Sequence, residues 1–146
     1  MKRSKRIEQL LKIMEGDAEK QAIKLANLQE QLSIEKTKIT QLEDFKNDYQ
    51  NNAPSKGASI NISQLQAMEK FIQQLDFSIS QQTKNIGLID AHVSAQRDVW
   101  LQYHNKVKAY EKWIAKLQLE EQLIESKQEQ KIMDEFVNSR FNINNK

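Results

Sequence analysis

Apolar residues recur along the first third of the chain with the seven-residue period of a coiled coil. Two series of positions, three residues apart, are apolar except at Gln21 and Glu35. The series are Leu11, Ala18, Leu25, Leu32 and Ile39, and Ile7, Met14, Leu28, Leu42 and Tyr49. Two apolar positions in every heptad form a seam that packs against another helix. The pattern therefore predicts a long helix over about residues 4–50.

The same pattern returns farther along the chain and lasts longer. One series holds Leu65, Ile72, Ile79, Ile86, Val93, Trp100, Val107 and Ile114, and the other holds Met68, Leu75, Gln82, Ile89, Gln96, Tyr103, Tyr110 and Leu117. Beyond Leu117 the seam weakens because polar residues take its positions, while Ile124 and Phe136 stay apolar. We expect a second helix over about residues 62–137, followed by a flexible tail over 138–146.

The segment between the two patterns, about residues 51–61, has the composition of a loop. Pro54 cannot continue a helix, and Gly57 permits a left-handed bend. Asn61 and Gln64 have the spacing of a capping box that starts the second helix. Because a short loop between two amphipathic helices favours antiparallel pairing, the sequence predicts a helical hairpin.

The predicted fold is all-α, with one coiled-coil domain over residues 1–146 in which two long antiparallel helices form a hairpin and the second is longer. Closing the loop near residues 51 and 62 pairs residues whose numbers sum to about 113. Ile7 then lies near Lys106, Leu42 lies opposite Phe71, and the second helix has no partner from about Tyr110 onward. An unpaired apolar stripe would be either an interface or a frayed end. Its residues would be Trp113, Ile114, Leu117, Ile124 and Phe136.

Gly16 interrupts the first helix with a residue that costs about 1 kcal/mol relative to alanine. Together with Ala18, it lies roughly opposite Trp100 in the expected register. We expect this small pair to leave room for the indole ring.

Phe45 and Phe71 lie beside the seam, each one position before a seam residue. The expected register brings them together, with Leu42, Tyr49 and Leu75 nearby. The two aromatic rings can broaden the core. Alternatively, they form an apolar patch near the loop that binds a helix or groove of another protein.

The composition suits long helices better than a globular domain with many turns. Of 146 residues, 38% are hydrophobic and 29% are charged, and the chain has one proline and three glycines. There is no cysteine, so disulfides and cysteine metal sites are excluded. The net charge of +2 gives no support for nucleic-acid binding. We expect the basic residues Lys2, Arg3, Lys5 and Arg6 to form a solvated helix end, with nucleic-acid binding as the alternative.

The sequence shows no pattern of catalytic or metal-binding residues. His92 and His104 are twelve residues apart and do not have the i, i+4 spacing of a helical metal pair. No glycine-rich phosphate loop occurs, and no apolar run is long enough to span a membrane. We therefore expect no catalytic residues, cofactor, metal site or transmembrane segment, and a cytoplasmic protein that acts by binding other proteins.

Four short motifs follow one another along the chain. They are Leu42-Glu-Asp-Phe45-Lys-Asn-Asp-Tyr49, Phe71-Ile-Gln-Gln-Leu75, Lys112-Trp113 and Glu129-Gln-Lys-Ile-Met133-Asp-Glu-Phe136. With the chain length and the Asn/Pro/Gly loop, this order resembles the FliJ family of flagellar export proteins. The resemblance extends from about Glu15 to Phe136.

The resemblance implies a part of the flagellar type III protein export apparatus, with a coiled coil similar to the central stalk, or γ subunit, of rotary ATPases. It implies binding to the ring of the export ATPase, to the cytoplasmic domain of the export gate and to substrate chaperones, at the inner face of the cytoplasmic membrane. By position, the gate and chaperone surface would hold Leu42, Phe45, Tyr49, Phe71 and Leu75. The ATPase end would hold Arg6, Ile7, Trp113, Met133, Asp134, Glu135 and Phe136.

The coiled-coil pattern alone also fits a structural spacer unrelated to export. In that case, the weakening seam after Leu117 would form a homodimer zipper. A monomer in solution favours the export protein, which we expect, and a tight dimer favours the spacer.

Overall fold

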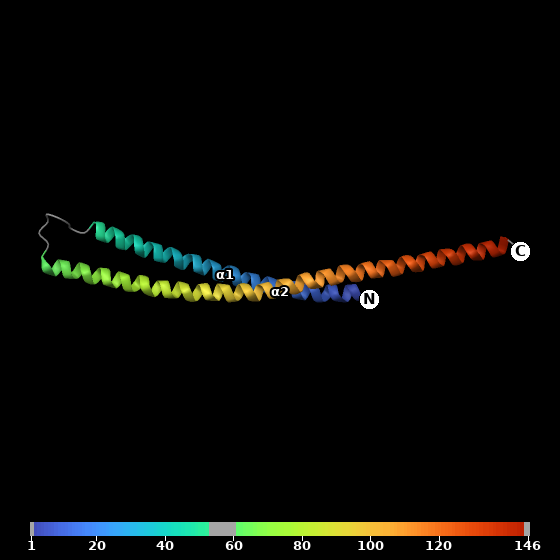
Figure 1. Cartoon of the computed structure of the whole chain (residues 1–146), viewed down its shortest axis with the longest axis horizontal. Helices are drawn as coiled ribbons and strands as arrows, with labels where there is room; N and C mark the ends of the chain where they lie inside the picture. The colour runs from blue at the N-terminus through green and yellow to red at the C-terminus, as the bar shows by residue number, and fades with distance from the viewer. Residues whose placement is uncertain (1, 53–60, 145–146) are drawn as a thin grey trace. The chain divides into compact units, whose positions relative to one another are not determined.

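Two long helices make up the described part of the chain. A computed structural model describes residues 2–52 and 61–144, in which α1 spans Arg3–Asn51 and α2 spans Ile62–Asn144 (Figure 1). The helices have 49 and 83 residues, and no strand occurs among the described residues. They form an antiparallel hairpin in which α2 is longer, so the predicted all-α fold class is confirmed.

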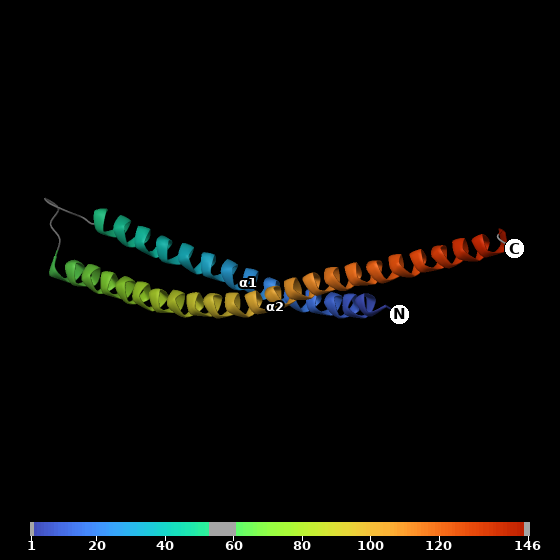
Figure 2. The same cartoon turned by 45° about the vertical axis from the view of Figure 1, so that its right-hand side comes forward.

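Contacts divide the chain into two compact units, each with a piece of both helices. The loop-side unit comprises residues 20–100, and the open-side unit comprises residues 1–19 and 101–146. Within each unit, the α1 piece and the α2 piece lie side by side and run in opposite directions (Figures 1 and 2).

The seam of the loop-side unit follows the predicted heptads. Every predicted seam position between residues 20 and 100 is buried or half-buried, apart from Leu65. Leu75, Ile89 and Val93 are the most buried, with exposed fractions of 8%, 6% and 3%. Leu65 is 48% exposed because it lies in the first turn of α2, opposite the end of α1.

Two polar pairs define the register of the loop-side unit. The side-chain amide of Gln96 donates to the carbonyl oxygen of Gln21 at 3.1 Å and to its Oε1 at 2.8 Å. The amide of Gln82 likewise donates to the carbonyl oxygen of Glu35, at 3.0 Å, and to its carboxylate. In both pairs the residue numbers sum to 117, so the expected value of about 113 is wrong. The position of the loop aligns the helices only loosely, whereas an amide in the seam must meet an acceptor.

The core of the open-side unit lies where the first two turns of α1 meet α2. Ile7, Ile114 and Leu117 are buried there, with exposed fractions of 8%, 6% and 6%. The partly buried side chains of Leu11, Tyr110 and Trp113 pack against them. This apolar cluster therefore joins the two helices in this unit.

This cluster corrects two expectations. Ile7 packs against Ile114 and Leu117 instead of lying near Lys106, which is about two helical turns earlier in α2. Trp113, Ile114 and Leu117 therefore have partners on α1, and the predicted unpaired stripe is wrong for these three residues. Two members of the stripe do lack cover, since Ile124 and Phe136 are 57% and 59% exposed.

The start of α2 follows the sequence closely, and its end does not. The backbone N–H of Gln64 donates to Oδ1 of Asn61 at 2.8 Å, and the N–H of Asn61 donates to Oε1 of Gln64 at 3.4 Å. This reciprocal pair is the predicted capping box. At the other end, α2 continues through Asn144, seven residues beyond the end predicted at 137. Arg140 lies 5.8 Å over the ring of Phe136, an i, i+4 contact that supports the added turns.

Two glycines lie inside the helices with open space around them. A Cβ added at Gly16 or Gly87 would meet no heavy atom within 4 Å. The expectation that Gly16 makes room for a neighbouring indole ring is therefore wrong. Both positions carry the cost of a glycine in a helix interior without a packing reason for it.

Candidate partner-binding surfaces

The loop-side unit carries an aromatic cluster near the end of α1 and the start of α2. The ring centroids of Phe45 and Phe71 are 6.1 Å apart with an interplanar angle of 73°, an edge-to-face contact. Those of Tyr49 and Phe71 are 4.6 Å apart at 55°. Phe71 of α2 therefore contacts two aromatic rings of α1. With the neighbouring seam residues Leu42 and Leu75, these rings form the surface that we name the loop-side patch.

The members of the loop-side patch differ in exposure. Leu75 is buried, and Leu42, Tyr49 and Phe71 are half-buried. Phe45 is 53% exposed, although it contacts Phe71. The patch therefore widens the seam and also leaves one aromatic ring accessible to another molecule.

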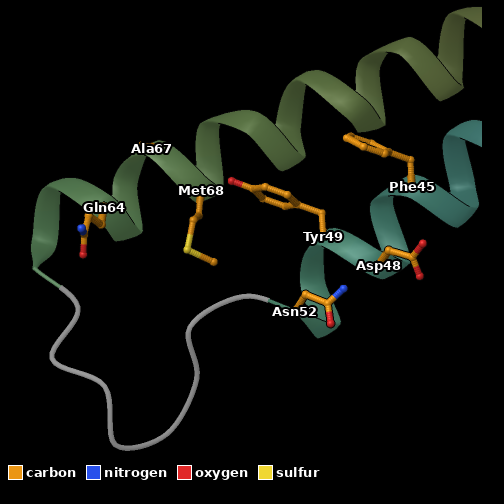
Figure 3. Close-up of a pocket in the computed structure, with 7 residues that line it drawn as sticks. All are labelled: Phe45, Asp48, Tyr49, Asn52, Gln64, Ala67 and Met68. Atoms are coloured by element: carbon orange, nitrogen blue, oxygen red, sulfur yellow. The ribbon is translucent and has the colours of Figure 1, made fainter.

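A hollow of about 540 Å³ opens beside Phe45 and Tyr49 (Figure 3). The other lining residues are Asp48 and Asn52 near the end of α1, and Gln64, Ala67 and Met68 at the start of α2. The lining therefore combines apolar groups with one carboxylate and two amides. The apolar pattern of the sequence did not mark Asp48 and Ala67 as surface residues. The spacing of Asp48, three residues after Phe45, was the available signal, because residues three apart share a helix face.

Polar contacts between the helices continue past the core of the open-side unit. Ser4 donates to the carboxylate of Glu121 twice, from its backbone N–H at 3.1 Å and from its hydroxyl at 2.7 Å. Lys2 forms an ion pair with Glu125. Gln118 donates to Oε1 of Glu8 at 2.7 Å. We name this set the polar clasp: Lys2, Ser4, Glu8, Gln118, Glu121 and Glu125.

The clasp stabilises charged side chains. The Ser4 hydroxyl, the Ser4 N–H and the charge of Lys2 hold the pKa of the Glu121 carboxyl below its ordinary value. The carboxylate also faces the N-terminal end of α1, where the helix dipole favours negative charge. The hydrogen bond and charge of Glu125 raise the pKa of Lys2. Both residues are therefore ionised at neutral pH.

The structure places the residues predicted for the ATPase end in different settings. Ile7 is buried, Arg6 is exposed, and Trp113 is half-buried beneath the Arg3 guanidinium, which lies 5.5 Å from its ring centroid. Phe136 lies nineteen residues after Leu117, about 28 Å farther along α2. Its neighbours Met133, Asp134 and Glu135 are exposed with it. The helix does not bring the two groups together.

Beyond the clasp, α2 continues without contact from α1, as the orange-to-red end of the ribbon in Figure 1 shows. Every residue from 122 to 143 is exposed. The large apolar side chains at the end of this stretch are Ile132, Met133, Phe136, Val137, Phe141 and Ile143, with exposed fractions between 57% and 71%. Phe141 and Ile143 were not among the predicted surface residues, because the predicted helix ended before them.

The described residues contain neither a metal-binding group nor a membrane-spanning helix. No group of three or more His, Cys, Asp or Glu side chains in residues 2–52 and 61–144 is arranged to hold a metal ion. Over the same ranges, neither helix contains a stretch long and apolar enough to cross a lipid bilayer.

Comparison with known proteins identifies the family of the chain. The family model described as "Flagellar FliJ protein" matches residues 3–146, nearly the whole chain. Comparisons with curated proteins and with solved structures found no match. The match agrees with the resemblance carried by the aromatic motifs and by the Met133–Phe136 segment. The chain therefore belongs to the flagellar FliJ family, whose members are components of flagellar protein export.

Proposed function

We propose that this protein is the central stalk of the flagellar export ATPase ring. The observation that carries the proposal is the end of α2, which continues as a helix past its last contact with α1 at Glu125. A single helix with exposed apolar side chains is narrow enough to enter a ring and apolar enough to bind its inner wall. The paired helices behind it would remain available to other export proteins.

The stalk proposal predicts a rise in ATPase turnover. We would titrate the chain into the matching export ATPase while the ring is only partly assembled, because a stalk that binds the assembled ring favours assembly. A chain ending at Lys131 should lose this rise. Its melting temperature should not change, since residues 132–143 make no contact with α1. Neither a rise nor co-elution with the full chain would contradict the stalk.

We propose a second role as an adaptor that binds the cytoplasmic domain of the export gate and substrate chaperones. The accessible ring of Phe45, held against Phe71 beside the hollow, supports this role. Exposed aromatic side chains in a partly apolar hollow are typical anchors for a partner helix. The adaptor would work in the cytoplasm, at the inner face of the membrane that holds the gate.

The adaptor proposal is tested by the double substitution Phe45→Ala and Phe71→Ala. Binding to the gate domain or to chaperones should weaken about tenfold or more, with little loss of helicity. Phe77→Ala is the matched control, because Phe77 is an exposed phenylalanine of the same unit outside the patch. Equal binding by the double variant and the control would remove the patch from the adaptor surface.

The family match removes the spacer unrelated to export, but a homodimer zipper at the end of α2 remains a competing structural role, and self-association distinguishes it. We expect a monomer in sedimentation experiments at micromolar concentration. A tight dimer that dissociates when residues 132–146 are removed would favour a zipper over a stalk.

A further inference from the structure

The seam of the loop-side unit has two sides, and they carry different kinds of side chain. Residues that come directly before a seam residue lie on one side, and residues that come directly after one lie on the other. On the first side, Phe45 contacts Phe71. Asp48 and Ala67, which also precede seam residues, line the hollow beside Phe45 (Figure 3). Between residues 20 and 100, we name this side of the seam the patch face and the other side the polar face.

The patch face carries exposed apolar side chains well beyond the loop-side patch. Ile34 and Leu88 each precede a seam residue, and they are 49% and 65% exposed. Ile34 lies about 16 Å from Phe45 along α1, and Leu88 lies about 26 Å from Phe71 along α2. In the register of this unit, Ile34 and Leu88 are within about 8 Å of the same level along the seam. Apolar surface therefore extends along this face into the middle of the unit.

The polar face has no comparable apolar side chain. Over residues 20–50 of α1 and 65–100 of α2, its largest apolar residue is alanine. Its charged residues are mostly acidic. They are Lys36, Glu43, Glu69, Asp76, Asp90 and Arg97. Exposed apolar surface beside the seam is therefore confined to one side, which is typical of a contact with another element on that side.

The patch face has the shape and length to bind a helix. Two helices that lie side by side leave a groove along their seam, and a third helix packs into such a groove in helical bundles. From Phe45 to Lys20 the face is about 38 Å long, the length of a helix of about 25 residues. A partner strand would need an open sheet edge, and no strand occurs among the described residues. An amphipathic helix is therefore the element that fits this face.

The charges of the patch face indicate what flanks that helix. Lys20, Lys24 and Lys38 lie on this face, and its one carboxylate within residues 20–50 and 65–100 is that of Asp48, near the loop. Lys38 forms an ion pair with Glu35 of the seam, whereas no described residue pairs with Lys20 or Lys24. Cations beside apolar side chains are complementary to carboxylates that flank the apolar stripe of a partner helix. The partner helix should therefore have acidic flanks.

A second copy of the chain and a lipid membrane fit the patch face less well. Two patch faces in contact would contribute three lysines and one carboxylate each, so most of the lysines would stay unpaired. A membrane-binding surface buries its apolar residues among acyl chains. Here the amides of Gln31, Gln81 and Asn85 lie on the same face as the apolar residues and would lose their hydrogen bonds in lipid. A helix of another protein can supply partners for these amides.

We propose that the patch face binds an amphipathic helix of a partner protein along its whole length, with carboxylates of that helix against Lys20 and Lys24. The inference rests on the proposed adaptor function, and it states which kind of element the adaptor binds in the gate domain or in a chaperone. The loop-side patch anchors one end of the helix, and Ile34 and Leu88 contact its middle. The polar face makes no contact with it.

The length of the contact is tested with two matched pairs of exposed apolar residues. Ile34→Ser with Leu88→Ser alters the patch face. Ile23→Ser with Phe77→Ser is the control, because these residues are 53% and 66% exposed and lie two positions from the nearest seam residue. Calorimetric titration with the purified gate domain and with each chaperone should show a Kd about tenfold higher for the first pair and nearly unchanged for the control. Circular dichroism of both variants should match the unaltered chain.

The acidic flanks are tested by charge reversal. Lys20→Glu with Lys24→Glu should weaken the same binding about tenfold and reduce its dependence on salt, because repulsion replaces attraction. Lys36→Glu with Arg97→Glu changes the net charge equally on the polar face and is the control. At 0.15 M salt its effect should stay below about twofold, since charges more than about 8 Å apart are largely screened. An equal loss in the two charge variants would overturn the acidic flanks.

The remaining outcomes separate the inference from the adaptor role. Unaltered binding by the Ile34→Ser and Leu88→Ser variant, with binding lost in the double alanine variant of the loop-side patch, would overturn the extended contact and leave the adaptor in place. Unaltered binding by both variants would overturn the adaptor and the inference with it. Vesicles of phosphatidylserine and phosphatidylcholine are the probe for a membrane. Binding of the unaltered chain to these vesicles, lost in the Ile34→Ser and Leu88→Ser variant, would overturn a protein helix as the occupant.

Discussion

The loop-side and open-side units pair the same two helices but end their seams with different chemistry. In the loop-side unit, the seam ends in aromatic rings, of which Phe45 remains 53% exposed. In the open-side unit, it ends in charged and amide groups that satisfy one another. The aromatic end of the loop-side unit leaves an exposed apolar surface on the paired helices themselves, where a partner can bind. At the polar end of the open-side unit, the side chains of the clasp pair with one another, so partner binding there would fall to the part of α2 that continues unpaired.

The largest expected effects come from the cores of the two units. Ile89 lies in one core and Ile114 in the other, and both are 6% exposed. Truncation of either to alanine should lower the free energy of unfolding by about 2–4 kcal/mol in urea titrations, through lost burial and the cavity left behind. If the units open separately, Ile114→Ala should lower amide hydrogen-exchange protection only in the open-side unit.

Ile23→Ala is the control for both core changes. Ile23 is 53% exposed, so its truncation should change stability by less than about 0.5 kcal/mol. Equal loss of protection in both units of Ile114→Ala would show that the two units unfold as one.

The amide layer between Gln21 and Gln96 should give the next largest effect. Gln96→Leu removes the donor and leaves the Gln21 amide without its partner in the seam, at a cost of about 1–3 kcal/mol. Adding Gln21→Leu should restore stability. It should also reduce the preference for a single register, since apolar layers pair in more than one alignment. Because the chain has no cysteine, engineered cysteine pairs can report the register by cross-linking. A double variant as unstable as the single one, with a single register, would contradict this role.

This layer also shows why the sequence predicted the seam but not the register. Heptad spacing is a property of each helix alone, so the seam positions follow from residues such as Val93 and Ile114. Alignment depends on both helices at once. The polar positions Gln21 and Glu35 are fourteen residues apart, as are Gln82 and Gln96, and antiparallel pairing matches the two sets in one register. The position of the loop therefore predicts the register less accurately than the matching of these polar residues does.

The candidate binding surfaces were likewise predictable only in part from the sequence. The aromatic contact between Phe45 and Phe71 was predictable because each residue precedes a seam position. The hollow beside it was not, because its lining by Asp48 and Met68 depends on how the helix ends align. The end of α2 was misjudged because asparagine is a weak helix former. Apolar residues nevertheless recur at helical spacing in this end of α2, through Phe141.

The two open glycines provide a smaller and directly matched comparison of the units. Gly16→Ala in the open-side unit and Gly87→Ala in the loop-side unit should each stabilise the protein by about 0.5–1 kcal/mol. The added methyl group meets no neighbour within 4 Å, and alanine restricts the unfolded chain. Thermal melts measure both effects. A destabilised Gly16→Ala variant would show that the helix needs glycine there for a reason other than space.

The smallest expected effect is the pH dependence of the polar clasp, because contacts between exposed charged groups contribute little to stability. The pKa of Glu121 is lowered in the folded protein, chiefly by the Ser4 hydroxyl. Its contribution is therefore present above the ordinary carboxyl pKa of 4.5 and is lost as the pH falls through the lowered value. Glu121→Gln should reduce the loss of melting temperature on acidification, and Ser4→Ala should move the pKa of Glu121 upward in an NMR titration. Glu120→Gln, one residue away and outside the clasp, is the control. An acid dependence unchanged by Glu121→Gln would mean that the clasp only ends the paired helices and does not stabilise them.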